Sequence, residues 1–171
     1  MKRIALIATM TLLSATPAFA HAGHGITSGF LHPFLGWDHL IAMLAVGAWG
    51  ATMGARAICA VPLAFISAMI FGGVVGMSGV EPPFVETMIL ASVVVLGGFA
   101  VARVKMPVWS GMAIVGVFAL AHGFAHGAEI PSTTNAWIYG GGFAVATSLI
   151  HALGAIAALA VTRMKTLSTT L

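Results

Sequence analysis

Five apolar stretches, each long enough to cross a lipid bilayer, constrain the fold of this chain more than any other feature. They lie at roughly 29 to 52, 57 to 77, 85 to 102, 108 to 127 and 136 to 161, and a helix needs about 20 apolar residues to cross the hydrocarbon core. Only 6% of the residues are charged and the mean hydropathy is +1.06, whereas soluble domains carry roughly 25% charged residues. The sequence therefore predicts an all-α, polytopic membrane helix bundle with about five transmembrane helices.

The N-terminal segment MKRIALIATMTLLSATPAFA has the features of a cleavable signal peptide. A basic pair precedes an apolar stretch, which ends in the small-x-small pattern Ala18-Phe19-Ala20. We expect cleavage after Ala20, which divides the chain into a signal peptide at 1–20 and a single transmembrane domain at 21–171. The alternative is a first helix that is not cleaved.

The distribution of charge predicts the orientation of the chain. Basic residues occupy alternate connections and the C-terminal tail: Arg56, Arg103, Lys105, Arg163 and Lys165. The other connections carry Glu81, Glu86 and Glu129. By the positive-inside rule the basic side is cytoplasmic, so we expect a periplasmic N-terminus, a cytoplasmic C-terminus and an odd number of spans. The expected location is the bacterial inner membrane, as a multi-pass protein.

Several classes of function are disfavoured by the sequence. The phosphate-binding pattern GxxxxGK[ST] does not occur, so action driven by ATP bound to this chain is not expected. The seven Lys and Arg residues are scattered and form no run suited to a nucleic-acid backbone. Cys59 is the only cysteine, which excludes an internal disulfide framework.

Two clusters of ligand-type side chains interrupt the apolar stretches. The first, in HPFLGWDH, contains His32, Asp38 and His39, and the second, in HGFAHGAE, contains His122, His126 and Glu129. Ionisable groups inside a membrane span are costly and usually mark a functional site. Two of the four acidic residues of the chain belong to these clusters. Polar contacts that only hold helices together are the structural alternative.

Helical periodicity predicts how each cluster is arranged. On the first helix, His32 and His39 are two turns apart and would share a face, and Asp38 would ligate an ion or orient a histidine ring. Pro33 suits the first turn of this helix or a kink, which places His32 at the outer rim. The second cluster would project from one stripe of its helix. Counting the rise per residue puts both clusters in the outer half of the membrane. Facing each other, they would offer an N/O ligand set suited to Ni²⁺, Co²⁺, Zn²⁺ or Cu²⁺ and unsuited to Ca²⁺ or Mg²⁺.

Three further histidines are secondary candidates for metal ligands. His151 lies near mid-membrane in the last stretch, close to Thr147 and Ser148; it would be a second station on a path inward, or a packed histidine bonded to a neighbouring helix. His21 and His24 would capture metal at the entrance, or form part of a solvated tail.

Small residues and tryptophans predict packing and depth. The pairs Gly50/Gly54, Gly72/Gly76 and Gly123/Gly127 have the spacing of closely packed membrane helices. The glycines at 140–142 are a place where the long last stretch would break, unless it tilts instead. Trp49, Trp109 and Trp137 fall near predicted span ends, as interfacial anchors do.

The two motifs together resemble those of the HupE/UreJ family of nickel/cobalt permeases. HPFLGWDH fits the pattern HPxxGxDH, and AHGFAHGAE corresponds to the histidine and acid motif of the fourth mature helix. The resemblance spans essentially the whole mature chain and maps the family's motif positions onto His32, Asp38, His39, His122, His126 and Glu129. It implies a permease rather than an enzyme, with Ni²⁺ or Co²⁺ as cargo and no prosthetic group, which supplies hydrogenase, urease or cobamide maturation.

Two other functions use similar residues. A zinc-dependent intramembrane hydrolase would activate water among the same histidines, with Glu129 or Asp38 as general base. A haem-binding electron carrier would need axial histidines on opposed helices. The partners expected for a permease are the metal ion and the lipid bilayer, and the sequence leaves open a homo-oligomer or a metallochaperone partner.

Overall fold

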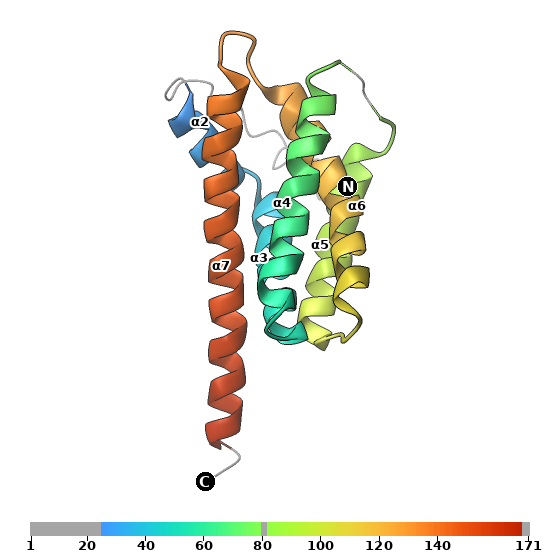
Figure 1. The fold of residues 1–171 in the computed structure, drawn as a ribbon, viewed down its shortest axis with the longest axis vertical. Helices are drawn as coiled ribbons and strands as arrows, with labels where there is room; N and C mark the ends of the chain where they lie inside the picture. Colours follow the sequence, from blue (N-terminus) through green and yellow to red (C-terminus); the bar gives the residue numbers. More distant parts are fainter. Residues whose placement is uncertain (1–24, 80–81, 169–171) are drawn as a thin grey trace, which may run out of the picture.

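The computed structural model describes residues 25–79 and 82–168, and all regular structure in them is helical (Figure 1). The expected signal peptide, His21, His24 and Glu81 lie outside the described residues. The elements in chain order are α2 (Ile26–Leu31), the 3₁₀ turn η1 (His32–Phe34), α3 (Trp37–Met53), α4 (Ala57–Gly76), α5 (Val85–Ala102), α6 (Val108–Glu129) and α7 (Ala136–Ser168).

Four of these helices, α4 to α7, are each long and apolar enough to cross a membrane. The segments Ile26–Phe34 and Trp37–Met53 pass the same test together, but they are bent by 85° at the break between them. The chain is therefore an all-helical membrane bundle with four spans, or five if the bent pair counts as one span. The expected fold class is confirmed.

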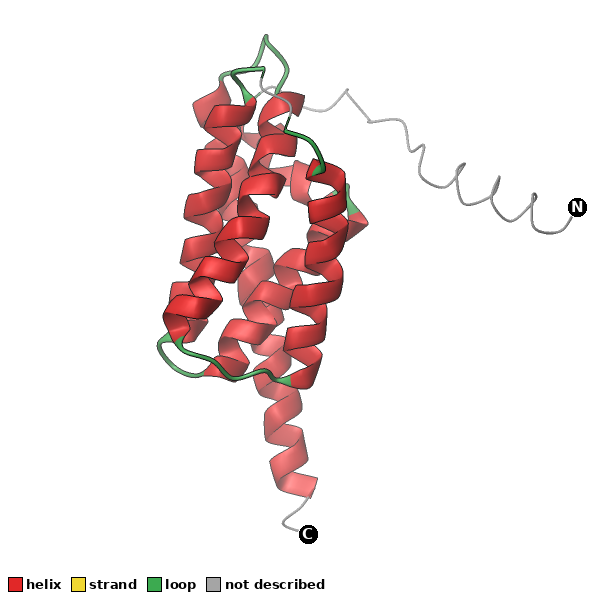
Figure 2. Ribbon diagram, turned by 90° about the vertical axis from the view of Figure 1, so that its right-hand side faces the viewer, coloured by secondary structure: helices red, strands yellow, loops and turns green. Residues whose placement is uncertain are grey.

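The helices run up and down, so that the charged residues separate to the two ends of the bundle. We call the end with Glu86, Glu129 and the α6–α7 loop the acidic end, and the end with Arg56, Arg103 and Lys105 the basic end. The acidic end is at the top of Figure 1. Helix α7 continues past the basic ends of the other helices (Figures 1 and 2). The alternation of charge along the sequence thus becomes a separation in space.

Glycines allow the helix backbones to come into direct contact. Helices α4 and α6 form the most extensive pair, and a Cβ atom at Gly123 would overlap the carbonyl oxygen of Met69. Gly127 meets Gly73 in the same way, and Gly72 and Gly76 lie against the backbone of α6. Two of the three predicted small-residue pairs therefore form one interface. The third differs, because Gly54 has a positive φ of 123° in the turn before α4.

The structure differs from the sequence-based expectations in the first span and at Trp49, and it decides between the two alternatives for the last helix. The first span is not one continuous helix, because it breaks between Phe34 and Trp37, so His32 and His39 do not share a face of one helix. Helix α7 is unbroken across 140–142; Gly142 instead packs against the backbone of Ile26 in α2. Trp49 is fully buried, and its Nε1 donates a hydrogen bond to the carbonyl oxygen of Val104 at 2.9 Å, so it is not an interfacial anchor.

We expect Gly123→Ala to destabilise the bundle by about 1–3 kcal/mol, because the added methyl group forces the α4 and α6 backbones apart. The matched control is Gly98→Ala in α5, where a Cβ atom meets nothing within 4 Å. That substitution should be neutral or should stabilise by up to about 1 kcal/mol, because alanine favours helix. Thermal unfolding of the two purified variants in detergent measures the difference, and equal melting temperatures would contradict the packing described above.

Candidate metal site

Five of the six residues in the two sequence clusters come together near the acidic end of the bundle. His32 lies in η1 and His39 in the first turn of α3, whereas the other three lie on α6. His122, His126 and Glu129 project from one stripe of that helix, as its periodicity predicts. The five side chains form two overlapping groups of possible metal ligands.

The inner group consists of His39, His122 and His126. One ring nitrogen from each lies within 4.8 Å of the others, and the Nδ1 atoms of His39 and His122 are 2.9 Å apart. Two imidazole nitrogens bound to one ion at about 2.0–2.1 Å lie roughly 3 Å apart. The two rings are therefore already close to the spacing that a shared ion requires.

The outer group consists of His32, His126 and Glu129. Glu129 Oε2 lies 3.0 Å from His32 Nε2 and 3.7 Å from His126 Nδ1. The ring of His126 contacts both His32 and His39, with centroid distances of 4.9 Å and 4.4 Å. Neither of its ring nitrogens has a hydrogen-bond partner among the described residues. His126 is thus the member that connects the outer group to the inner group.

Exposure falls steadily along this row of side chains. The exposed fraction of the side chain is 57% at Glu129, 26% at His32 and 6% at His126, and His122 is fully buried. A cation that entered at Glu129 would therefore exchange solvent for protein ligands in steps. Neutral imidazoles with one carboxylate form a donor set of intermediate softness, which suits Ni²⁺, Co²⁺, Zn²⁺ or Cu²⁺.

Ser92 on α5 fixes the orientation of the deepest histidine of the inner group. Its hydroxyl donates to the carbonyl oxygen of Ile89 at 2.6 Å and lies 2.9 Å from His122 Nε2. Because the hydroxyl proton is engaged by Ile89, the Nε2–H of His122 donates to the serine oxygen. The lone pair of His122 Nδ1 is then left facing His39. Such partners orient metal-binding histidines and raise their basicity.

The first motif also contains Gly36 and Asp38, which shape the site without joining either ligand group. A Cβ atom at Gly36 would lie 2.8 Å from Cδ2 of His39, so glycine leaves room for the ring. The carboxylate of Asp38 accepts a hydrogen bond from the backbone N–H of His39 at 2.8 Å. Asp38 therefore supports the first turn of α3, and its side chain adjoins His39 in sequence and in space.

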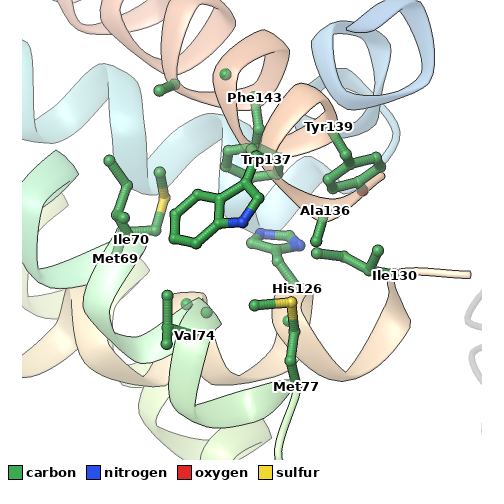
Figure 3. Close-up of a pocket in the computed structure, with 16 residues that line it drawn as sticks. Met69, Ile70, Val74, Met77, His126, Ile130, Ala136, Trp137, Tyr139 and Phe143 are labelled. Atoms are coloured by element: carbon green, nitrogen blue, oxygen red, sulfur yellow. The ribbon is translucent and has the colours of Figure 1, made fainter. Parts of the chain in front are cut away.

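A cavity of about 300 Å³ lies beside His126, between α4, α6 and α7. Figure 3 shows the imidazole of His126 among the side chains of Met69, Met77, Trp137 and Phe143. His126 is the only histidine, carboxylate or cysteine among the residues that line this cavity. The other side chains that line the cavity are almost all apolar, so the ring that both groups share is the metal-ligand side chain that faces it.

The remaining candidates are placed differently. His151 is buried on α7 and belongs to neither ligand group. Sequence reasoning missed Ser92, although it is the only polar side chain between Met88 and Ala102. A lone hydroxyl in the middle of an apolar stretch was the available signal.

Comparison with known proteins agrees with the resemblance seen in the two motifs. The family model described as HupE / UreJ protein matches residues 8–171. The chain is 42% identical over 153 residues to "Protein HupE" of Rhizobium leguminosarum bv. viciae, a match that covers 86% of this chain and 80% of that protein. No solved structure matches significantly.

We expect Ser92→Ala to weaken metal binding by about 10- to 100-fold, the usual effect of removing a partner that orients a ligand histidine. Nickel binding to the purified protein, measured by equilibrium dialysis, tests this. The matched control is Ser78→Ala, because Ser78 also donates to the carbonyl oxygen three residues earlier, at 2.6 Å, but is exposed. Equal affinities in the two variants would show that Ser92 does not act on the site.

Proposed function

This chain belongs to the HupE/UreJ family of membrane transporters, which is associated with nickel uptake, and from that premise we propose that it is a permease for a divalent transition metal. The cargo is Ni²⁺ or Co²⁺, and the route runs from the periplasm to the cytoplasm. The single observation that carries this proposal is the row of ligand side chains from Glu129 to His122, along which exposure falls to zero.

The proposed path begins with capture at the outer group. An ion first meets Glu129 and His32, passes to His126, and loses further water as His39 and His122 bind it. His126 supports this transfer because its ring lies within contact of His32 and His39. Asp38 contributes through His39, because its carboxylate accepts a hydrogen bond from the backbone N–H of His39. His21 and His24 would add a capture point ahead of this row.

The proposed membrane arrangement follows from the charges at the two ends. The basic end, with Arg56, Arg103 and Lys105, faces the cytoplasm by the positive-inside rule, and the acidic end faces the periplasm of a bacterial inner membrane. A signal peptide at 1–20 would be removed, which leaves 21–171 as one permease domain. This arrangement supports uptake, since the exposed ligands are then on the outer side.

The membrane potential can supply the driving force. Each charge that crosses 100 mV is worth about 2.3 kcal/mol, so a divalent cation moving inward gains about 4.6 kcal/mol. That free energy supports accumulation of roughly 10³-fold, since about 1.4 kcal/mol corresponds to a factor of ten. The proposed uptake therefore does not require that this chain bind ATP.

The imported metal would serve the maturation of hydrogenase or urease, or the synthesis of cobamides. Transfer of the metal to a metallochaperone, or assembly as a homo-oligomer, would fit this role.

Membership in a transporter family argues against the zinc hydrolase and the haem carrier as alternatives. The donor set alone does not select nickel, because affinity for such ligands rises from cobalt through nickel to copper. Selectivity must then come from geometry and from which metal is available.

We expect His126→Ala to reduce nickel uptake to the background level, because this residue belongs to both ligand groups. His39→Ala should do the same, and Asp38→Ala should act in the same direction through His39. The measurement is accumulation of radiolabelled nickel in cells that lack other nickel and cobalt importers, with unlabelled cobalt as competitor.

Ser78→Ala provides the control for expression and membrane insertion, because that residue is exposed and lies away from both ligand groups. All variants should reach the membrane in similar amounts on an immunoblot. Wild-type rates of uptake in His126→Ala and His39→Ala would contradict the proposed path. Uptake of neither nickel nor cobalt by the wild-type protein would contradict the proposed function itself.

A further inference from the structure

A second set of buried polar groups lies on α7, apart from both ligand groups. His151 is 2% exposed and Thr147 is fully buried. Three of their polar atoms have no hydrogen-bond partner within residues 25–79 and 82–168: both ring nitrogens of His151 and the hydroxyl oxygen of Thr147. The two residues are four apart on one helix and therefore lie on the same face. Native structures leave few buried polar groups unpaired, so three such atoms in one place need an explanation.

The behaviour of neighbouring hydroxyls shows that Thr147 is unusual. Ser148 and Thr162, on the same helix, donate to the carbonyl oxygens of Ala144 and Ala158, four residues earlier, at 2.7 Å and 2.8 Å. A serine or threonine hydroxyl inside a helix commonly forms this hydrogen bond to the backbone of its own helix. Thr147 does not make this bond. Its hydroxyl is therefore free to bind something other than its own backbone.

The ring of Phe65 contacts a histidine of this set and a histidine of the inner ligand group. Phe65 on α4 is fully buried, and its ring centroid lies 5.5 Å from that of His122 and 5.2 Å from that of His151. Among the described residues, Phe65 thus connects His122 to His151, and Thr147 lies one turn from His151 on the same face of α7. Phe65 stands between the two positions as an apolar partition.

The backbone around His151 is held tightly. A Cβ atom at Gly47 in α3 would overlap the carbonyl oxygen of His151, and one at Gly154 would overlap the carbonyl oxygen of Leu44. Helices α3 and α7 therefore touch at His151 and again three residues further along α7. His151 is fixed in the interior and cannot reach solvent by a small shift of its helix.

We propose that His151 and Thr147 form an inner station, which a divalent metal ion that still carries water occupies after it passes Phe65. The inference rests on the proposed function, because it names a second binding position on the same route. One imidazole nitrogen and one hydroxyl oxygen supply two ligands, fewer than the three histidines of the inner group. A station with fewer protein ligands binds more weakly, and conduction requires sites that an ion can leave.

The test uses His151→Leu and Thr147→Val in the full-length protein. His151→Leu keeps an apolar side chain of similar length, and Thr147→Val keeps the shape of threonine without its hydroxyl. The control is Ser148→Ala, which removes an exposed hydroxyl from the adjacent position of α7. Two measurements are made on each variant: the rate of radiolabelled nickel uptake in cells, and nickel binding to the purified protein by equilibrium dialysis.

We expect His151→Leu to slow uptake by about tenfold or more, since a lost bond to a charged partner is large enough to change a rate by that factor. Thr147→Val should slow it in the same direction. Dialysis should show unchanged tight binding at the histidines of the inner group, with loss of one weaker equivalent of nickel. Ser148→Ala should match the wild-type protein in both measurements.

Unchanged uptake and an unchanged number of bound equivalents in His151→Leu would overturn the inner station, and the proposed function would stand because the wild-type protein still transports. If His151→Leu fails to fold, Thr147→Val decides, because it keeps the branched shape of the side chain and exchanges only the hydroxyl for a methyl group. Wild-type uptake and binding in a folded Thr147→Val variant would then assign the pair to packing alone. Absence of uptake by the wild-type protein is a different result, which contradicts the permease and not specifically this station.

Discussion

Direct contact between helix backbones sets the spacing of the helices that carry the candidate site. In a bilayer there is no hydrophobic driving force between helices, so association depends on close packing at small residues. Gly123 brings α6 against α4 at Met69, one residue from His122, and Gly47 brings α3 against α7 at His151. Ligand side chains on different helices are held at fixed separations because the backbones behind them cannot move closer or slide. A larger residue at either glycine would change the spacing of the histidines before it changed any ligand.

The sequence predicted the parts of the site that depend on local geometry. The stripe of His122, His126 and Glu129 follows from helical periodicity alone. The contacts of His39 with His122 and His126 show that the two clusters meet, whereas their depth in the membrane stays a prediction. The bend of 85° in the first span could not be read in this way. Helix α2 packs against α7, and this long-range contact has no signature in the local pattern. The bend explains how His32 reaches Glu129 although it does not share a helix face with His39.

Hydrogen bonds between side chains and groups on different helices also could not be predicted from the sequence. The hydroxyl of Ser92 acts on His122 across 30 positions of chain, and no spacing rule connects α5 with α6. Trp49 gives the opposite case: its place near a span end suggests an interfacial anchor, but its indole finds the carbonyl oxygen of Val104 inside the bundle. In both cases the deciding contact lies between helices, where a buried polar group must find a partner. The local sequence pattern predicts which polar side chains are costly to bury in the membrane. The packing of the helices decides which groups form hydrogen bonds with them.

The state of hydrogen bonding along the route has a physical consequence for transport. Glu129 and His32 pair with each other, and His122 is held by Ser92, whereas His126, His151 and Thr147 keep unpaired polar atoms. An ion that binds a paired ligand must first break a hydrogen bond, which offsets part of the binding free energy. An ion that binds an unpaired buried ligand relieves a cost that the protein already bears. Hydrogen-bonded ligands and unpaired ligands alternate along the row. The free energies of metal binding at neighbouring positions therefore differ less than the number of ligands alone would predict. Since conduction fails when one position binds much more tightly than the next, this alternation is consistent with the proposed route between the outer group and His151.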